Sequence, residues 1–131
     1  MMTLLDVADM LADVLDFEDI YAGNIDANKD RCIGVYASKN AYPQKMCIGG
    51  KASTKTEEKA VTILVHWTDN PTTAEIKANE ILDKLTDVRG YIANDYTVGF
   101  FKLKIPQPVG RDDRGICEYV IETTIYYERN K

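Results

Sequence analysis

The sequence predicts an α+β domain with a mostly antiparallel sheet and two helices packed on one face. Two stretches carry apolar residues three and four positions apart, which is typical of amphipathic helices, and other segments alternate as strands do. These segments follow one another as helix, strands, helix, strands. The chain has 131 residues, the usual size of one domain, so we expect residues 1–131 to form one unit around one core.

The first expected element is a helix over residues 2–16. Its apolar stripe consists of Leu4, Val7, Ala8, Leu11, Val14 and Leu15. The opposite side carries an acidic ridge of Asp6, Asp9, Asp13 and Asp16, which we expect to face water. Because these aspartates interrupt the apolar run, the segment is predicted to be neither a signal peptide nor a membrane span.

The segments after this helix are predicted to form hairpins. Three of them have strand-type composition between turns that contain Asn, Asp or Pro: residues 19–22, 32–37 and 44–48. Gly49 and Gly50 can adopt the positive φ angles of a sharp reversal. Residues 50–59 contain several lysines and no large apolar side chain, so we expect an exposed loop or hairpin arm there.

The clearest strand pattern lies at residues 60–67, followed by the second helix. One face of this strand carries Val61, Ile63, Val65 and Trp67, and the other carries Thr62, Leu64 and His66. Asn70 can cap the helix with Pro71 in its first turn, and Thr72 with Glu75 offers an alternative capping box. The apolar stripe of the helix ends near Gly90.

Two further strands are expected, at residues 97–105 and 116–128. The sequence PQPVGRDDRG joins them and is predicted to be a turn, because its Pro and Gly residues cannot continue a ladder. The buried face of the last strand is predicted to carry Cys117, Tyr119, Ile121, Ile125 and Tyr127, and its wetter face Glu118, Glu122 and Thr124. Tyr126, also on the wetter face, is either packed or an anchor for a partner.

Composition excludes several classes of function. The net charge of −5 disfavours binding to nucleic-acid phosphates. Three cysteines stand far apart without a CxxC motif, which indicates neither a disulfide framework nor a zinc site and favours a reducing compartment: Cys32, Cys47 and Cys117.

The residues with catalytic potential do not form a recognisable motif. His66 is the only histidine, and no nucleophile motif accompanies it. Asp112 and Asp113 are flanked by Arg111 and Arg114, which favours a charged turn over a catalytic dyad. The glycines lack the spacing of a phosphate-binding loop. We therefore expect no enzyme, cofactor or metal site; an enzyme using His66, Asp112 and Asp113 stays open as the less favoured alternative.

Several phrases, taken in order, resemble the phage tail terminator or minor capsid family. They are KMCIGGK, KAVTILVHW, IPQPVGRDDRG and CEYVIETTIYYER, and they span nearly the whole chain. In that family a strand commonly ends in a double glycine before a loop and a core strand, and a Pro followed by a Gly-Arg-Asp turn precedes a closing strand. The chain departs from the family at His66 and Trp67, where such proteins more often carry an arginine.

The resemblance implies a virion protein assembled in the host cytoplasm. Six copies would form a ring that caps the tail tube, ends its polymerisation and offers a surface to a head completion or connector protein. DNA would pass through without specific binding, and no membrane would be involved. The candidate subunit or partner interface consists of Gly49, Gly50, Lys51, Lys55, Lys59, Arg111, Asp112, Asp113 and Arg114. The candidate lumen residues are Asp6, Asp9 and Asp13.

Two alternatives to a terminator stay open at this point. Another head-tail connector or neck protein would share the acidity and the ring, and would bind the portal or its adaptor instead of the tail tube. A small ligand-binding module outside the virion would have a closed apolar pocket and form no ring.

Overall fold

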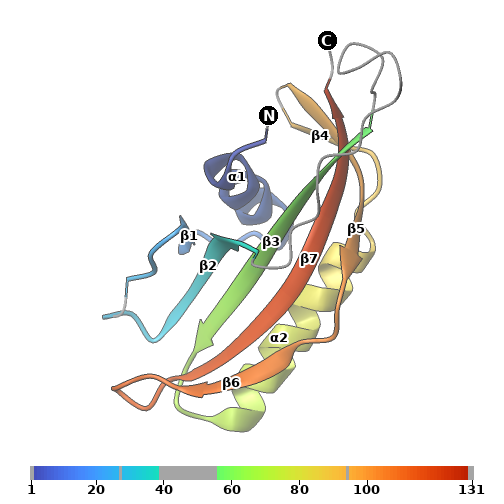
Figure 1. Cartoon of the computed structure of the whole chain (residues 1–131). Helices are drawn as coiled ribbons and strands as arrows, with labels where there is room; N and C mark the ends of the chain where they lie inside the picture. The colour runs from blue at the N-terminus through green and yellow to red at the C-terminus, as the bar shows by residue number, and fades with distance from the viewer. Residues whose placement is uncertain (1, 27, 39–55, 94, 130–131) are drawn as a thin grey trace.

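The computed structural model describes residues 2–26, 28–38, 56–93 and 95–129. The elements follow in the order α1 (Leu4–Leu15), β1 (Ile20–Ala22), β2 (Arg31–Ala37), β3 (Thr56–Trp67), α2 (Pro71–Thr86), β4 (Tyr91–Ala93), β5 (Tyr96–Leu103), β6 (Gln107–Arg111) and β7 (Cys117–Arg129) (Figure 1). The strand predicted at residues 44–48 and the candidate residues Gly49, Gly50, Lys51 and Lys55 lie outside the described residues.

The strands form one mixed sheet in the order β1-β2-β3-β7-β5-β4, with β6 also paired to β7. β1 runs parallel to β2, and the other pairings are antiparallel. β3 and β7 are the long central strands, paired from Thr56 opposite Glu128 to His66 opposite Glu118. The other side of β7 pairs with β5 along its C-terminal half and with β6 along its N-terminal half. The sheet is therefore antiparallel except at its β1 edge.

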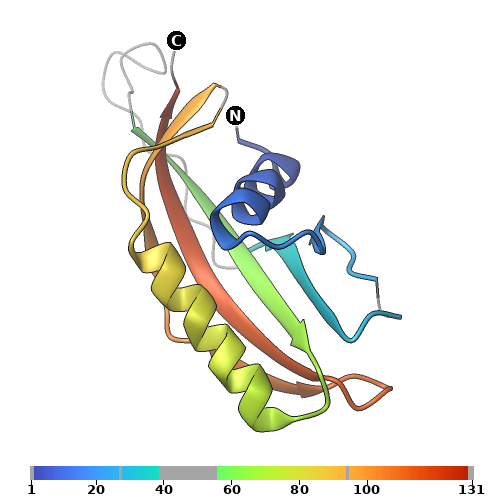
Figure 2. The same cartoon turned by 180° about the vertical axis from the view of Figure 1, so that it is seen from behind.

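Alternate residues of the central strands form the core together with residues of the helices. Ile63, Val65, Ile121 and Ile125 are fully buried, and they belong to one hydrophobic cluster with residues of α1 and α2. Figure 2 shows α1 and α2 in front of the sheet in the rear view. Burying each such aliphatic side chain stabilises the fold by about 1.5–3 kcal/mol relative to exposing it. The alternation predicted for β7 is confirmed except at Tyr119, which is half-buried like Glu118, Glu122 and Thr124, whereas Cys117, Ile121, Ile125 and Tyr127 are buried.

The helix ends follow local capping. Thr3 and Asp6 form a capping box, so α1 begins at Leu4, and it ends at Leu15 because Asp16 adopts a left-handed φ of 52°. In α2 the Asn70 side chain accepts hydrogen bonds from the backbone N–H groups of Thr72 (2.9 Å) and Thr73 (3.1 Å). Asn70 is thus the cap, and the alternative capping box is not used. None of the helices within the described ranges is long and apolar enough to cross a membrane.

Two predictions about loops were wrong. The PQPVGRDDRG segment contains β6, which pairs with β7 through a register shift between Pro108 and Gly110. Pro is tolerated in an edge strand and at a bulge, and Gly110 has a φ of 127°, so the sheet edge accommodates both residues.

The predicted arm at 50–59 is also wrong at its end. Thr56 to Lys59 belong to β3, where Lys59 is half-buried and Glu57 pairs with Arg129 at 2.8 Å.

Candidate functional site

The single histidine lies between two carboxylates at one end of the sheet. His66 is fully buried, and its Nδ1 lies 2.9 Å from Oε2 of Glu118, its cross-strand neighbour. Its Nε2 lies 3.5 Å from Oδ2 of Asp112 and has no hydrogen-bond partner in the described part of the chain. A general base must reach its substrate, and a side chain with no exposed surface does not. This geometry favours a structural role for His66, holding the β6–β7 turn against β3.

Asp112 organises that turn. Its Oδ1 accepts hydrogen bonds at 2.9 Å from the backbone N–H groups of Ile116 and Arg114. The hydrogen bond from Ile116 is the main cause that lowers the pKa of Asp112 below the usual 3.8, because it stabilises the ionised carboxylate. Asp112, and not Asp113, lies beside His66, so the structure does not assemble the carboxylate pair considered from the sequence.

The two arginines of the turn bind within the chain. Arg111 donates to the carbonyl oxygens of Asp69 (3.0 Å) and Gly115 (2.8 Å), and Arg114 pairs with Asp30 at 2.9 Å. These contacts connect the turn to the segments that flank β2 and β3. Lys59 lies elsewhere, because it is opposite Ile125 of β7 while Arg111 is opposite Cys117. The two positions are roughly 25 Å apart along the strand, at about 3.3 Å per residue.

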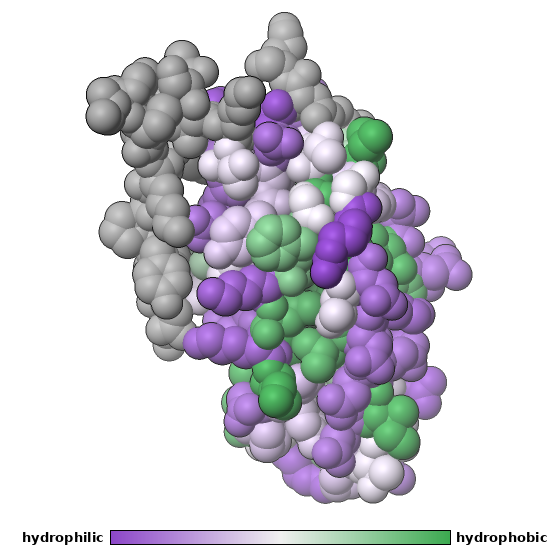
Figure 3. Space-filling view, turned by 90° about the vertical axis from the view of Figure 1, so that its right-hand side faces the viewer, coloured by the Kyte–Doolittle hydropathy of each residue, from purple (hydrophilic) through white to green (hydrophobic). Residues whose placement is uncertain are grey.

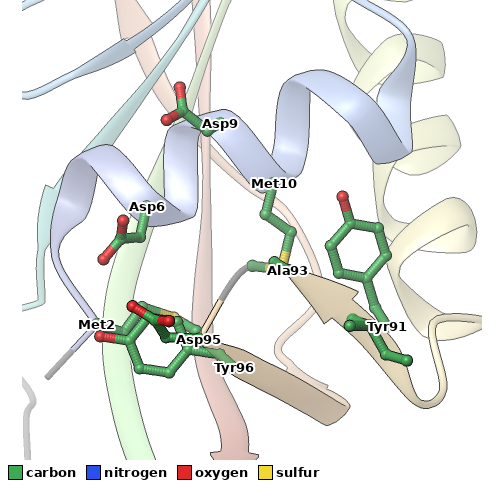
Figure 4. A pocket seen from close by; sticks show the side chains of 9 residues that line it. Met2, Asp6, Asp9, Met10, Tyr91, Ala93, Asp95 and Tyr96 are labelled. Carbon is green, nitrogen blue, oxygen red and sulfur yellow. The ribbon is translucent and has the colours of Figure 1, made fainter. Parts of the chain in front are cut away.

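A second region is a cavity of about 350 Å³ between α1 and the β4–β5 hairpin, which we call the acidic cavity. It is lined by Met2, Asp6, Asp9, Met10, Tyr91, Ile92, Ala93, Asp95 and Tyr96. Figure 4 shows Asp6 above Asp95 and Tyr96, with Asp9 pointing away from the cavity floor. Its described lining includes three aspartates and no Lys or Arg. Among the described residues, no His, Cys, Asp or Glu side chains gather to hold a metal ion.

The aspartates of α1 differ in their surroundings. Asp9, Asp13 and Asp16 are exposed as predicted, whereas Asp6 is half-buried and accepts a hydrogen bond from the Thr3 backbone at 2.9 Å. Asp13 accepts a short hydrogen bond from the Tyr91 hydroxyl, which raises the pKa of Tyr91 to about 12. Burial raises the pKa of Tyr96 as well, and the charges of Asp6 and Asp95 add to this effect. The cavity is thus an environment of negative potential.

A third region lies where β5 leads into β6. Three of its apolar side chains are exposed, Phe100 by 42%, Ile105 by 72% and Val109 by 57%, and Lys102 and Lys104 stand among them. We call these five residues the β5–β6 surface. Phe100 stacks on Tyr126 with ring centroids 4.6 Å apart. Figure 3 shows the side of the molecule that carries β5 and α2, where hydrophobic side chains gather in a band between hydrophilic ones.

Comparison with known families decides what kind of protein carries these surfaces. The family model described as "Bacteriophage tail terminator protein" matches residues 6–129, from within α1 to the last residue of β7. The chain belongs to the bacteriophage tail terminator protein family. The resemblance expected from the sequence is confirmed, and the chain is a structural protein of the phage tail and a virion component.

A solved structure has the same fold as this chain. It is a chain from the virion of a native gene transfer agent particle, with a TM-score of 0.54 and 10% sequence identity. The match covers 96% of this chain and 89% of the other chain, so the likeness includes the whole α+β architecture. No curated protein sequence matches this chain significantly.

The sequence predicted one of these three regions and did not predict the other two. The Arg111 to Arg114 turn was singled out, but Glu118 was not, although its place opposite His66 follows from the register of two alternating strands. The acidic cavity joins residues 2–10 to residues 91–96, and no local pattern links these segments. The β5–β6 surface was missed because Ile105 and Val109 look like ordinary strand and turn residues until their exposure is known.

Proposed function

We propose that this tail terminator protein forms a ring, a hexamer, that caps the tail tube, ends its polymerisation and offers a surface for head attachment. The observation that carries the proposal is the family match over residues 6–129. The protein acts through its surfaces and is not an enzyme; the complete burial of His66 between Glu118 and Asp112 supports this. Assembly takes place in the host cytoplasm.

The partners are copies of the chain itself, the tail tube protein and a head completion or connector protein. We infer that both helices cover the same face of the sheet, which leaves the face with Phe100 and Tyr126 available to neighbours. The Arg111 to Arg114 turn, Lys59 and residues 49–55 are candidate contacts with these partners. For Arg111 and Arg114, internal hydrogen bonds and an ion pair favour positioning of the turn over direct binding.

DNA passes through the ring without specific binding. The net charge of −5 supports this, because an acidic protein gains no counterion release from contact with phosphates. Asp6, Asp9 and Asp13 stay the candidate lumen residues. The bonds from Thr3 to Asp6 and from Tyr91 to Asp13 favour a local structural role for these two aspartates.

The test is whether the purified protein caps purified tail tubes, observed by electron microscopy. Rings at tube ends, and tubes that stop growing when the protein is added to polymerising tube protein, are the expected result. Tubes that stay bare, together with binding to portal complexes, would overturn the terminator role in favour of a neck protein. A Lys84→Glu variant, altered on the outer side of α2, serves as a control for nonspecific charge effects.

A further inference from the structure

The β5–β6 surface has the composition of a protein contact. Exposed large apolar side chains are uncommon on the surface of a monomer, and Phe100, Ile105 and Val109 follow one another along the side of β7 that pairs with β5 and β6. Lys102 and Lys104 are exposed and have no ion-pair partner among the described residues. A partner for this surface must offer apolar area together with negative charge.

The acidic cavity offers that combination on the same chain. Asp9 and Asp95 are exposed at its border, and Asp6 lies within it. Ile92 of its lining is 73% exposed, and Leu5, one helical turn from Asp9, is 61% exposed. Five of the six exposed large hydrophobics that the structure describes therefore lie at the two regions, and the sixth is Ile76 on α2.

We propose that the β5–β6 surface of one copy docks on the acidic cavity of the next copy. The inference rests on the proposed ring, and it names the two unlike surfaces that a head-to-tail ring requires in each subunit. Lys102 and Lys104 face the carboxylates of Asp9 and Asp95, and the exposed apolar side chains lie against one another. The occupant is a second copy because both halves of the complementary pair are present in one chain.

Charge exchange tests the pairing. The Lys102→Glu/Lys104→Glu variant places carboxylates opposite the acidic cavity, and Asp9→Lys/Asp95→Lys places lysines opposite the β5–β6 surface. Each variant alone is expected to self-associate at least about tenfold more weakly than the wild type, because like charges face one another. A 1:1 mixture of the two variants restores opposite charges at every contact and is expected to recover assembly. All altered residues are exposed, and circular dichroism checks that each variant is folded.

Native mass measurements give the size of the assemblies that form in solution at low salt. Electron microscopy counts the rings on tail tubes. The matched control is Lys84→Glu/Arg89→Glu, which reverses two exposed cations near the end of α2 and is expected to assemble as the wild type does. Single variants that assemble normally, or a mixture that stays dissociated, would overturn the pairing. A wild-type chain that associates neither in solution nor on tubes would overturn it as well.

The outcomes separate this inference from the proposed function. Rings on tube ends that tolerate both charge reversals leave the terminator role intact and refute the interface. Charge-dependent association into a closed dimer, without capping of tubes, supports the interface and refutes the ring.

Discussion

The β6–β7 turn and the β5–β6 surface both carry clustered cations, but only the turn neutralises its own charge. Arg111 donates to two carbonyl oxygens, and Arg114 pairs with Asp30. Lys102 and Lys104 have no such partner within the described residues. In the sequence the turn is the more conspicuous cluster, and for that reason it was singled out as an interface.

This difference shows that a charged side chain is available to a partner only if it lacks contacts within its own chain. The number of charges near it in the sequence does not decide this. Turn residues approach the backbone and often bind it, since tight turns leave peptide groups without ladder partners. Alternate residues of a strand, such as Lys102 in β5, project away from the backbone and keep their charge for a neighbour. If this comparison is valid, changes in the turn reduce stability, and changes in the β5–β6 surface reduce assembly.

The largest loss of stability is expected for Glu118→Ala. The substitution leaves the buried His66 ring without its 2.9 Å partner, and an unsatisfied buried polar group costs about 1–3 kcal/mol. Urea unfolding followed by tryptophan fluorescence measures the change, since Trp67 is the only tryptophan. Glu128→Ala, at the exposed end of β7, is the control and should unfold as the wild type does. Equal midpoints for the two variants would show that the Glu118 contact stabilises nothing.

Acid should lower the stability that Asp112 gives to the β6–β7 turn. The pKa of Asp112 is lowered in the folded state, so ionised Asp112 stabilises the turn at neutral pH, and this contribution disappears as the pH falls through the lowered value. Asp112→Asn should therefore flatten the dependence of the unfolding midpoint on pH between about 5 and 2 relative to the wild type. Asp113→Asn is the matched control and should retain the wild-type slope. The same slope in all three proteins would contradict the assignment.

A smaller loss of stability is expected when the exposed ion pair between Arg114 and Asp30 is removed from the turn. Arg114→Ala removes the ion pair with Asp30, in which the Arg114 side chain is 46% exposed and the Asp30 side chain 60% exposed. Ion pairs this exposed contribute about 0–1 kcal/mol to stability. The loss should shrink in high salt because screening already weakens the pair. Unfolding at low and high ionic strength measures this, and a cost that is independent of salt would point to packing instead of charge.

The long-range parts of the fold were the hardest to predict. The helices, β3 and β7 follow from periodicity, and Asn70 was recognised as a cap by its position before Pro71. β6 was missed because Pro108 and Gly110 disfavour strands locally, whereas pairing with β7 at the sheet edge overrides that preference. The hairpin predicted for residues 19–22 and 32–37 was wrong, because β1 and β2 pair in parallel. The direction of this pairing is not encoded in either segment alone.

The candidate site, like the fold, was predictable only where it depends on local sequence. The family was recognised from motifs in order along the chain, which is information that the sequence contains directly. The position of Asp112 beside His66 depends on a turn packing against the end of a strand 46 positions earlier, and the acidic cavity depends on a hairpin meeting α1. Residue types alone could not choose between Asp112 and Asp113, because both have the same neighbours in sequence.

The smallest effect on stability should accompany a large effect on assembly. Ile105→Ser alters a side chain that is 72% exposed, so the free energy of unfolding should change by less than about 0.5 kcal/mol. If Ile105 is buried against the next copy, the same change weakens ring formation, because apolar area that binding should remove from water is lost. Ile76→Ser is the matched control, since Ile76 is 63% exposed on α2, outside both proposed surfaces. Unfolding midpoints and ring counts of the two variants would be compared side by side. A pair of variants that assemble equally well would place the contact elsewhere, whereas a defect confined to Ile105→Ser would show that the exposed Ile105 side chain serves binding.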